Sequence, residues 1–233
     1  ELLETQGVVS LQKYFEKLVS ESRTSKTKAI RSIMNDSNFK LARTKASILY
    51  EEKVEHPKLI ELQNIIEKEI SADKDAKIII FNQYRDNAVD IAEKLNRIEK
   101  VSAKVFVGQH KKNETGLNQK EQKHLLEDFK NGLLNVLVAT SIGEEGLDIS
   151  KVDLVIFYEP IPSAIRSIQR RGRTGRQSKG RVIILMAKGT RDEAYKWVAH
   201  HKEKRMYRNL TNLRKKLNLS LSEKKEVPTA RFV

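Results

Sequence analysis

A chain of 233 residues with 39% hydrophobic residues can bury the core of one large domain, or of one domain with an appendage. Lys and Arg number 45 against 31 Asp and Glu, so the net charge of +14 favours a polyanionic partner, above all nucleic acid. The absence of cysteine excludes disulfides and thiolate metal sites, and we predict no metal site. No apolar run reaches the roughly 20 residues that span a membrane, and the first residues, Glu1 to Glu4, resemble neither a secretory nor a transit peptide. We therefore expect an intracellular protein, cytoplasmic or nucleoid-associated.

The first part of the chain has the apolar spacing of helices. From Gly7 to about Lys53 apolar residues recur at helical steps, namely Leu11, Phe15, Leu18, Ala29, Ile30, Ile33, Met34, Ile48 and Leu49. The stripe is thin for an independent core, and its polar face is rich in Lys and Ser. That face is either the solvated surface of a helical appendage or a nucleic-acid contact. We predict a helical segment over residues 1–55.

From residue 56 the pattern changes to strands that alternate with helices. Pro57 favours a helix start, and the apolar face of this helix comprises Leu59, Leu62, Ile66 and Ile70. Short apolar runs typical of strands buried on both faces then occur at residues 77–81, 103–107, 135–139, 153–158 and 181–186. Helices are predicted around residues 88–95, from Asn118, and from Pro162 through Gln169. We predict an α/β domain with a doubly wound parallel sheet over residues 56–217.

Two helix starts carry the residues of a capping box, Asn118 with Glu121 and Thr190 with Glu193. The second start opens a last helix that we expect to end near Leu217. Its apolar residues alternate by four and three positions, which predicts a packed inner face, at Met206, Leu210, Leu213 and Leu217. Two aromatic residues of this helix, Trp197 and Tyr207, are either core residues or a platform for a base. Residues 218–233 are polar and Lys-rich, which predicts a linker or tail.

Polar segments follow three of the predicted strands, at residues 82–85, 108–110 and 140–148. In open α/β sheets, ligands bind outside the carboxyl ends of the strands. We therefore expect these three segments to share one edge of the sheet.

Residues 169–176 contain four arginines and two glycines, and no acidic residue occurs between Glu159 and Asp192. A solvated structural helix would interleave Glu with Arg. Arginine presents a planar fork that matches phosphate oxygens, and glycine allows a close approach of the backbone. The run therefore predicts a phosphate site, either at a specific position or as a basic patch that binds phosphate without specificity.

The run at residues 169–176 (QRRGRTGR) resembles motif VI of the superfamily 2 helicases, and residues 140–149 (TSIGEEGLDI) resemble their motif V. Residues 82–85 are similar to motif IV. The wording of the two longer motifs resembles most the branch that holds archaeal Hef and the Fanconi-anaemia M protein. Residues 107–109 with 119–122 look like an extra motif of this group, or else are a loop and an ordinary capped helix. This resemblance implies a RecA-like second motor lobe, preceded by the end of an inserted helical domain.

The resemblance also implies the nucleotide-binding residues. Arg173 and Arg176 would be arginine fingers that stabilise charge on the γ-phosphate of ATP as water attacks. Gln169 would hydrogen-bond near the γ-phosphate or to the opposing lobe, while Gly146 and Asp148 would lie at the nucleotide.

The nucleic-acid contacts implied by the resemblance lie in motifs IV and V. Thr140 and Ser141 would contact the phosphate backbone of the bound strand, which positions DNA without reading bases. Gln83 and Arg85 would add to that grip. Arg170 and Arg171 would either contact phosphate or form ion pairs with Glu144, Glu145 or the first lobe, and the resemblance leaves both roles open.

The sequence contains neither a G-x-x-x-x-G-K-[ST] phosphate loop nor a D-E-x-H or D-E-x-D quartet. We therefore expect the cofactors ATP and Mg²⁺ to be held mainly by a first RecA-like lobe of the same protein. The resemblance implies an ATP-dependent DNA helicase or translocase that acts on forked or branched DNA in repair, while the isolated fragment would be inactive. The alternatives are an RNA-directed helicase lobe of the RIG-I-like group, and a non-catalytic basic module that binds nucleic acid.

Overall fold

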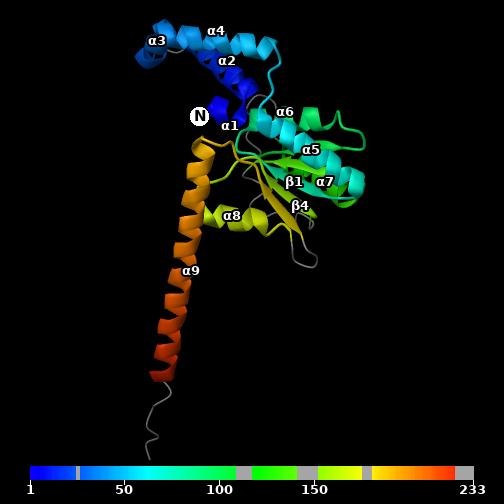
Figure 1. The fold of residues 1–233 in the computed structure, drawn as a ribbon, viewed down its shortest axis with the longest axis vertical. Coiled ribbons are helices and arrows are strands. Elements are labelled where there is room, and N and C mark those ends of the chain that lie inside the picture. The colour runs from blue at the N-terminus through cyan, green and yellow to red at the C-terminus, as the bar shows by residue number, and fades with distance from the viewer. Residues whose placement is uncertain (25–26, 109–116, 141–151, 175–179, 224–233) are drawn as a thin grey trace, which may run out of the picture.

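Five parallel strands form one sheet in the order β2-β3-β1-β4-β5 in the computed structural model (Figure 1). The strands are β1 (Ile78–Phe81), β2 (Ala103–Phe106), β3 (Val136–Ala139), β4 (Leu154–Phe157) and β5 (Arg181–Ile184). The structure describes residues 1–24, 27–108, 117–140, 152–174 and 180–223, and side chains as far as residue 217. The predicted parallel sheet is confirmed, and every strand lies inside its predicted range.

Nine helices occur among the described residues. They are α1 (Leu2–Gln6), α2 (Val8–Thr24), α3 (Lys28–Asn35), α4 (Ser37–Glu51), α5 (Pro57–Ala72), α6 (Arg85–Leu95), α7 (Gln119–Lys130), α8 (Ala164–Arg171) and α9 (Arg191–Glu223). No helix of the described residues is long and apolar enough to cross a membrane.

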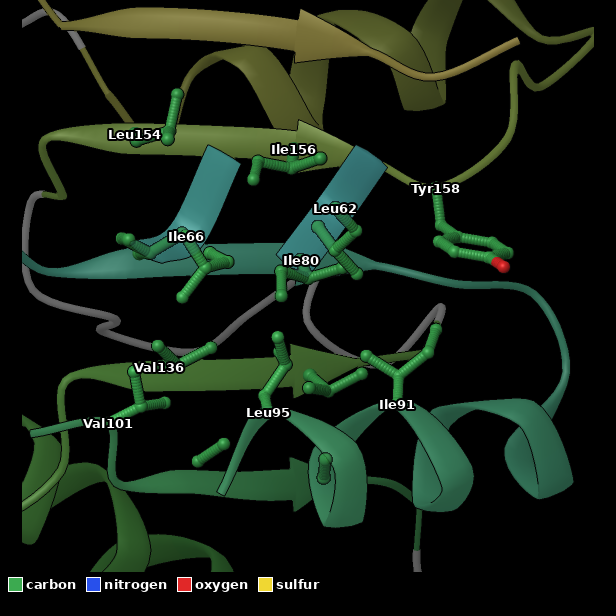
Figure 2. Close-up of a cluster of buried hydrophobic side chains, with 14 of the residues drawn as sticks. Leu62, Ile66, Ile80, Ile91, Leu95, Val101, Val136, Leu154, Ile156 and Tyr158 are labelled. Carbon is green, nitrogen blue, oxygen red and sulfur yellow. The ribbon is translucent and has the colours of Figure 1, made fainter. Parts of the chain in front are cut away.

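The central strand β1 is buried on both faces. Ile78 and Ile80 lie in a cluster with the apolar faces of α5 and α6, whereas Ile79 and Phe81 lie in a second cluster with Phe129 of α7. Figure 2 shows the first cluster, in which side chains of α5 and α6 meet those of the strands. The continuous apolar run follows from this arrangement, because alternate residues of a strand point to opposite faces.

Local signals set two of the helix starts as predicted. Pro57 is the first residue of α5, and the predicted apolar face of that helix is buried. Asn118 caps α7 with the complete capping box, since its side chain accepts from the Glu121 backbone N–H at 2.9 Å and Glu121 accepts from the Asn118 N–H at 2.6 Å. Helix α8 begins later than Pro162, because the Ser163 side chain caps it by accepting from the Arg166 N–H.

The helices of the N-terminal segment are confirmed, and their shared core is small. Phe15 of α2 packs edge-on against Phe39 of α4 with ring centroids 5.2 Å apart, and Ala46 of α4 is also buried. Ile33 and Ile48 are exposed, and α3 buries no residue. The division of the chain into domains at residues 55 and 56 stays a prediction.

The last helix differs from its prediction in three ways. It continues to Glu223, past the expected end near Leu217. The predicted packed face is wrong for Leu210, Leu213 and Leu217, which are 54%, 56% and 61% exposed. Figure 1 shows the reason: the C-terminal half of α9 projects beyond the sheet, so its amphipathic stripe has no described layer to pack on.

The start of α9 is also capped differently. The Thr190 hydroxyl accepts from the Asp192 N–H at 3.2 Å and donates to the Ala187 carbonyl, whereas Glu193 donates its N–H to the Thr190 backbone carbonyl. The second predicted capping box is therefore replaced by a simpler cap. Trp197 and Tyr207, for which a core position was one of two readings, are both exposed.

Candidate nucleotide and nucleic-acid site

The segments that follow β1, β2 and β3 lie together at the carboxyl edge of the sheet. Strand β1 lies between β3 and β4, and the Asn82 N–H donates to the Ala139 carbonyl at 2.9 Å, just past the strand ends. Thr140 in turn donates its N–H to the Phe106 carbonyl at 3.1 Å. The expected clustering of motif IV with the start of motif V at one edge is thus observed for the described residues.

Motif IV turns the chain from β1 into α6. The side-chain oxygen of Asn82 accepts a hydrogen bond from the Tyr84 backbone N–H at 2.8 Å, which stabilises the turn. Gln83 is exposed at the edge, where a ligand can reach it. Arg85, the first residue of α6, donates to the Gly108 carbonyl at 3.2 Å, so part of its donor capacity holds the segment after β2.

The first residue of motif V is less accessible than expected for a residue that contacts nucleic acid. Thr140 is buried at the end of β3. Ser141, Gly146 and Asp148 lie outside the described residues.

Motif VI lies on α8 and the turn that follows it. Gln169 is half-buried on α8, and the helix ends at Gly172, whose N–H donates to the Ile168 carbonyl at 2.8 Å. Arg173 follows and is half-buried, and its carbonyl accepts from the Val152 N–H at 3.3 Å. The Thr174 hydroxyl donates to the Val152 carbonyl at 2.6 Å. Arg176 lies outside the described residues.

This pairing joins motif VI to the residues that lead into β4. Val152 and Thr174 form a parallel bridge ahead of β4, at the opposite end of that strand from the motif IV turn. The position of the Arg173 backbone is therefore fixed by the chain that leads into β4. Sequence spacing gave no indication of this bridge.

The remaining arginines of the run have internal roles. Arg170 is almost fully buried, with its guanidinium 4.8 Å from the ring centroid of Phe81 and 5.5 Å from that of Phe157, which is a cation–π distance. Burial excludes Arg170 from an external phosphate. Arg171 donates to Glu203 of α9 at 2.7 Å, a partner that the sequence did not predict.

The extra motif is structural where the structure describes it. Gln122 is buried on α7, and its side-chain amide donates to the carbonyls of Val107 and Leu117 at 3.1 Å each. These bonds hold the segment after β2 against α7. Gln109 lies outside the described residues.

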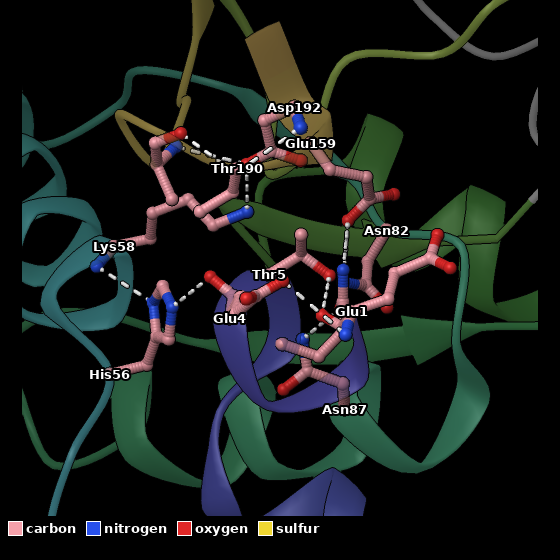
Figure 3. A network of polar contacts seen from close by, with 12 residues as sticks. Glu1, Glu4, Thr5, His56, Lys58, Asn82, Asn87, Glu159, Thr190 and Asp192 are labelled. Atoms are coloured by element: carbon pink, nitrogen blue, oxygen red, sulfur yellow. Dashed lines mark hydrogen bonds and ion pairs between the residues drawn. The ribbon is translucent and has the colours of Figure 1, made fainter. Parts of the chain in front are cut away.

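One charged residue at the carboxyl edge was missed by the sequence analysis. Glu159 follows β4 and is buried, and one of its oxygens accepts from Gln6 at 3.2 Å and from Asn82 at 3.1 Å (Figure 3). Burial raises the pKa of Glu159 to about 7, against the lowering effect of the Gln6 hydrogen bond and of the positive charge of Arg170. Its partners are distant in sequence, so no local signal pointed to it.

The order of motifs and the parallel sheet match a known family. The model of the helicase conserved C-terminal domain matches residues 58–178, more than half of the chain. The chain belongs to this family. A second model, a helical bundle described for an ATP-dependent RNA helicase, matches residues 1–56.

Known helicases resemble this helicase lobe in sequence and fold. The crystal structure of the Pyrococcus furiosus Hef helicase domain is 50% identical, with a TM-score of 0.63 over 84% of this chain and 40% of that one. ATP-dependent DNA helicase fml1 of Schizosaccharomyces pombe is 39% identical, over 82% of this chain and 23% of its own length. The Fanconi anemia group M protein homolog of Mus musculus is 33% identical, over 98% of this chain and 11% of its own.

These comparisons define the branch and the fold. The lobe is the RecA-like C-terminal motor lobe of a superfamily 2 helicase of the Hef and Fanconi-anaemia M branch, with an N-terminal helical segment. A DEAD box protein from Methanococcus jannaschii, 21% identical with a TM-score of 0.51 over 61% of this chain and 36% of that one, shares the fold. The chain spans less than a third of the length of the curated relatives described above.

Proposed function

We propose that this chain is the second motor lobe of an ATP-dependent DNA helicase or translocase that acts on forked or branched DNA in repair. The observation that carries the proposal is the bridge of Val152 and Thr174, because it holds the Arg173 backbone in a fixed position beside the chain that leads into β4. An arginine finger must be preorganised to stabilise the charge of the transition state, and the fixed backbone of Arg173 supplies this preorganisation.

The donor set fits a triphosphate. Arg173 and Gln169 are half-buried on or next to α8, and Arg176 follows in an interval free of acidic residues. In the proposed function, bound ATP and Mg²⁺ supply the phosphoryl group and most of the charge neutralisation, held mainly by a first lobe. Arg173 and Arg176 stabilise charge on the γ-phosphate, Gln169 donates or accepts a hydrogen bond near it, and Gly146 with Asp148 contacts the nucleotide.

The nucleic-acid contacts in this proposal come from the carboxyl edge. Gln83 is exposed there, Arg85 begins α6, and Thr140 follows the end of β3. Together with Ser141 they contact the phosphate backbone without reading bases. Thr140 is 6% exposed, and in this proposal its hydroxyl makes the contact that a change to alanine would remove.

The fingers are tested in the full-length, two-lobe protein. Arg173→Ala and Arg176→Ala should each lower ATP turnover by about 10³-fold or more, because such arginines act on charge that develops in the transition state. DNA affinity without nucleotide should stay within about twofold, as binding of the strand does not depend on a finger. Lysine should rescue poorly, since a point charge lacks the planar fork. Arg97→Ala, at an exposed arginine between α6 and β2, is the matched control.

If the arginine variants lost DNA affinity in proportion to their loss of ATP turnover, the arginine run of residues 169–176 would act by binding nucleic acid. The non-catalytic module would then be the better-supported function. The RNA-directed alternative is supported by the description of the helical-bundle family, which names an RNA helicase. To distinguish this alternative from the DNA proposal, ATP turnover is measured with DNA and RNA forks of the same sequence and length. Greater stimulation by RNA would reject the DNA proposal and leave the arginine fingers in place.

A further inference from the structure

The first helix of the chain inserts a glutamine into the carboxyl edge of the sheet. Gln6 ends α1 and is only 3% exposed. Its amide donates to Glu159 at 3.2 Å, while its carbonyl oxygen accepts from Asn82 at 3.0 Å and from Asn87 at 2.8 Å. One side chain from the helical segment thus bonds to the end of β1, to α6 and to the end of β4.

The backbone around Gln6 is held in the same position. Gly7 has a φ of 92°, and a side chain there would meet the His56 Cβ at 3.0 Å, so glycine is required both for conformation and for space. The His56 ring lies 2.8 Å from the Glu4 carbonyl (Figure 3). Glu1 pairs with Arg191 and accepts from Tyr195. Helix α1 is therefore fixed to the motor lobe on several sides.

The carboxylate that Gln6 contacts is also under the influence of motif VI. Arg170 on α8 lies under the rings of Phe81 and Phe157, the last residues of β1 and β4, and its positive charge acts on Glu159. Arg170 adjoins Gln169 and is separated from Arg173 by only two residues. A displacement of Glu159 therefore changes the environment of a side chain that anchors α8.

We propose that Gln6 and Glu159 are positioning residues that couple the helical segment α1–α4 to motif VI, so that engagement of that segment by nucleic acid changes turnover at the arginine fingers. The inference rests on the proposed function. Glutamine suits the task because its amide presents a donor to the carboxylate and an acceptor to the two asparagines at the same time. Neither residue touches the reacting atoms.

The hydrogen bond between Gln6 and Glu159 can be tested by exchanging the two side chains. Gln6→Leu keeps the size of the side chain and removes all three hydrogen bonds. In the double variant Gln6→Glu/Glu159→Gln, residue 6 still accepts from Asn82 and Asn87, and residue 159 donates to residue 6. The exchange preserves both the bond between the segments and the net charge of the network.

The experiment measures ATP turnover of the full-length protein with and without a DNA fork, together with the fork concentration for half-maximal stimulation. Gln6→Leu should leave basal turnover and half-saturation within about twofold and lower the stimulated rate by about fivefold or more, a typical coupling energy expressed as a ratio. The exchange variant should restore at least half of the loss. Gln12→Leu removes the bonds of Gln12 to Glu16 of α2 and Ser47 of α4, both within the helical segment, and is the matched control.

Equal losses of basal and stimulated turnover, without rescue by the exchange, would show a role in folding only and overturn the proposal. Wild-type stimulation in Gln6→Leu would overturn it as well. If Gln6→Leu does not fold, Gln6→Asn replaces it, because the shorter amide cannot reach both Glu159 and Asn87. Failure of the proposed function is distinguishable, since Arg173→Ala would then retain turnover whatever the Gln6 variants do.

Discussion

Lys58 and Asp192 form a buried ion pair with Nζ 2.9 Å from Oδ2, and their side chains are 5% and 1% exposed. Lys58 lies in the first turn of α5, and Asp192 in the first turn of α9. The ammonium is also 4.8 Å from the centroid of the Tyr158 ring, and the carboxylate accepts from the Ala187 N–H at 2.9 Å. The pair therefore joins the first helix of the α/β domain to the last (Figure 3).

Breaking this pair should be costly on either side. Lys58→Ala or Asp192→Ala leaves one buried charge without its partner, which is expected to lower the free energy of unfolding by about 3–5 kcal/mol. Urea unfolding measures the change. Lys17→Ala, in the exposed pair of Lys17 with Glu21, is the control and should change the same quantity by less than about 1 kcal/mol.

A double replacement Lys58→Met/Asp192→Leu should be much less destabilising than either single change, because no unpaired charge remains. Losses that simply add in the double variant would show that the two residues act independently and would contradict the coupling.

The buried carboxyl of Glu159 predicts a pH dependence of stability. Its pKa is raised to about 7 by burial, so the folded chain binds this proton more tightly than the unfolded chain does. The stabilising contribution is complete below the pKa of the unfolded chain and is lost as pH rises through about 7. The groups that act on the carboxyl are Gln6, Asn82, Arg170 and Lys58, together with the backbone of Gln83.

Urea midpoints at several pH values test this prediction. Glu159→Gln should remove the part of the decline that occurs between about pH 5 and 7, since glutamine does not titrate. Glu127→Gln, at an exposed carboxylate of α7, should leave the decline as it is in the unmodified chain. A wild-type profile that is flat over this interval would contradict the raised pKa.

Leucines of α5 and α9 should respond very differently to truncation. Leu62→Ala, at a fully buried position, is expected to lower the free energy of unfolding by about 2–5 kcal/mol. Leu213→Ala, at an exposed position of α9, should change it by less than about 0.5 kcal/mol. A large loss at Leu213 in the isolated chain would show that the C-terminal half of α9 packs after all.

Thr140 should affect nucleic-acid binding more than the chemical step. In the full-length protein, Thr140→Ala should weaken DNA binding and DNA-stimulated turnover, with a smaller effect on basal turnover, because the proposed contact is to the bound strand. A fork titration at two salt concentrations measures it, and Arg97→Ala serves as the control. A loss confined to basal turnover would place Thr140 at the nucleotide instead.

Several features of this chain follow from local sequence. The strand of residues 78–81 was predictable because a strand in the middle of a parallel sheet is buried on both faces and is apolar throughout. Asn118 with Glu121 defined the start of α7, since a capping box is satisfied within one turn of chain. The arginine run and the segment after β3 indicated the family through their resemblance to helicase motifs VI and V.

Other features depended on the tertiary structure. Gln6 and Glu159 are single polar residues 153 positions apart, and only folding shows that they share a buried hydrogen bond. Arg170 could not be separated from its neighbours in the arginine run until the rings of Phe81 and Phe157 were placed against it.

The stripe of leucines on α9 shows the same limit in reverse. Its period correctly predicted a helix, but the packed face was wrong, because periodicity reports that a helix has an apolar side and not whether another layer lies against it. Helix and strand type arise from interactions within a few residues, which the sequence contains. Burial, ion pairs and the partners of isolated polar groups arise from contacts between distant segments, and these exist only once the sheet has brought the segments together.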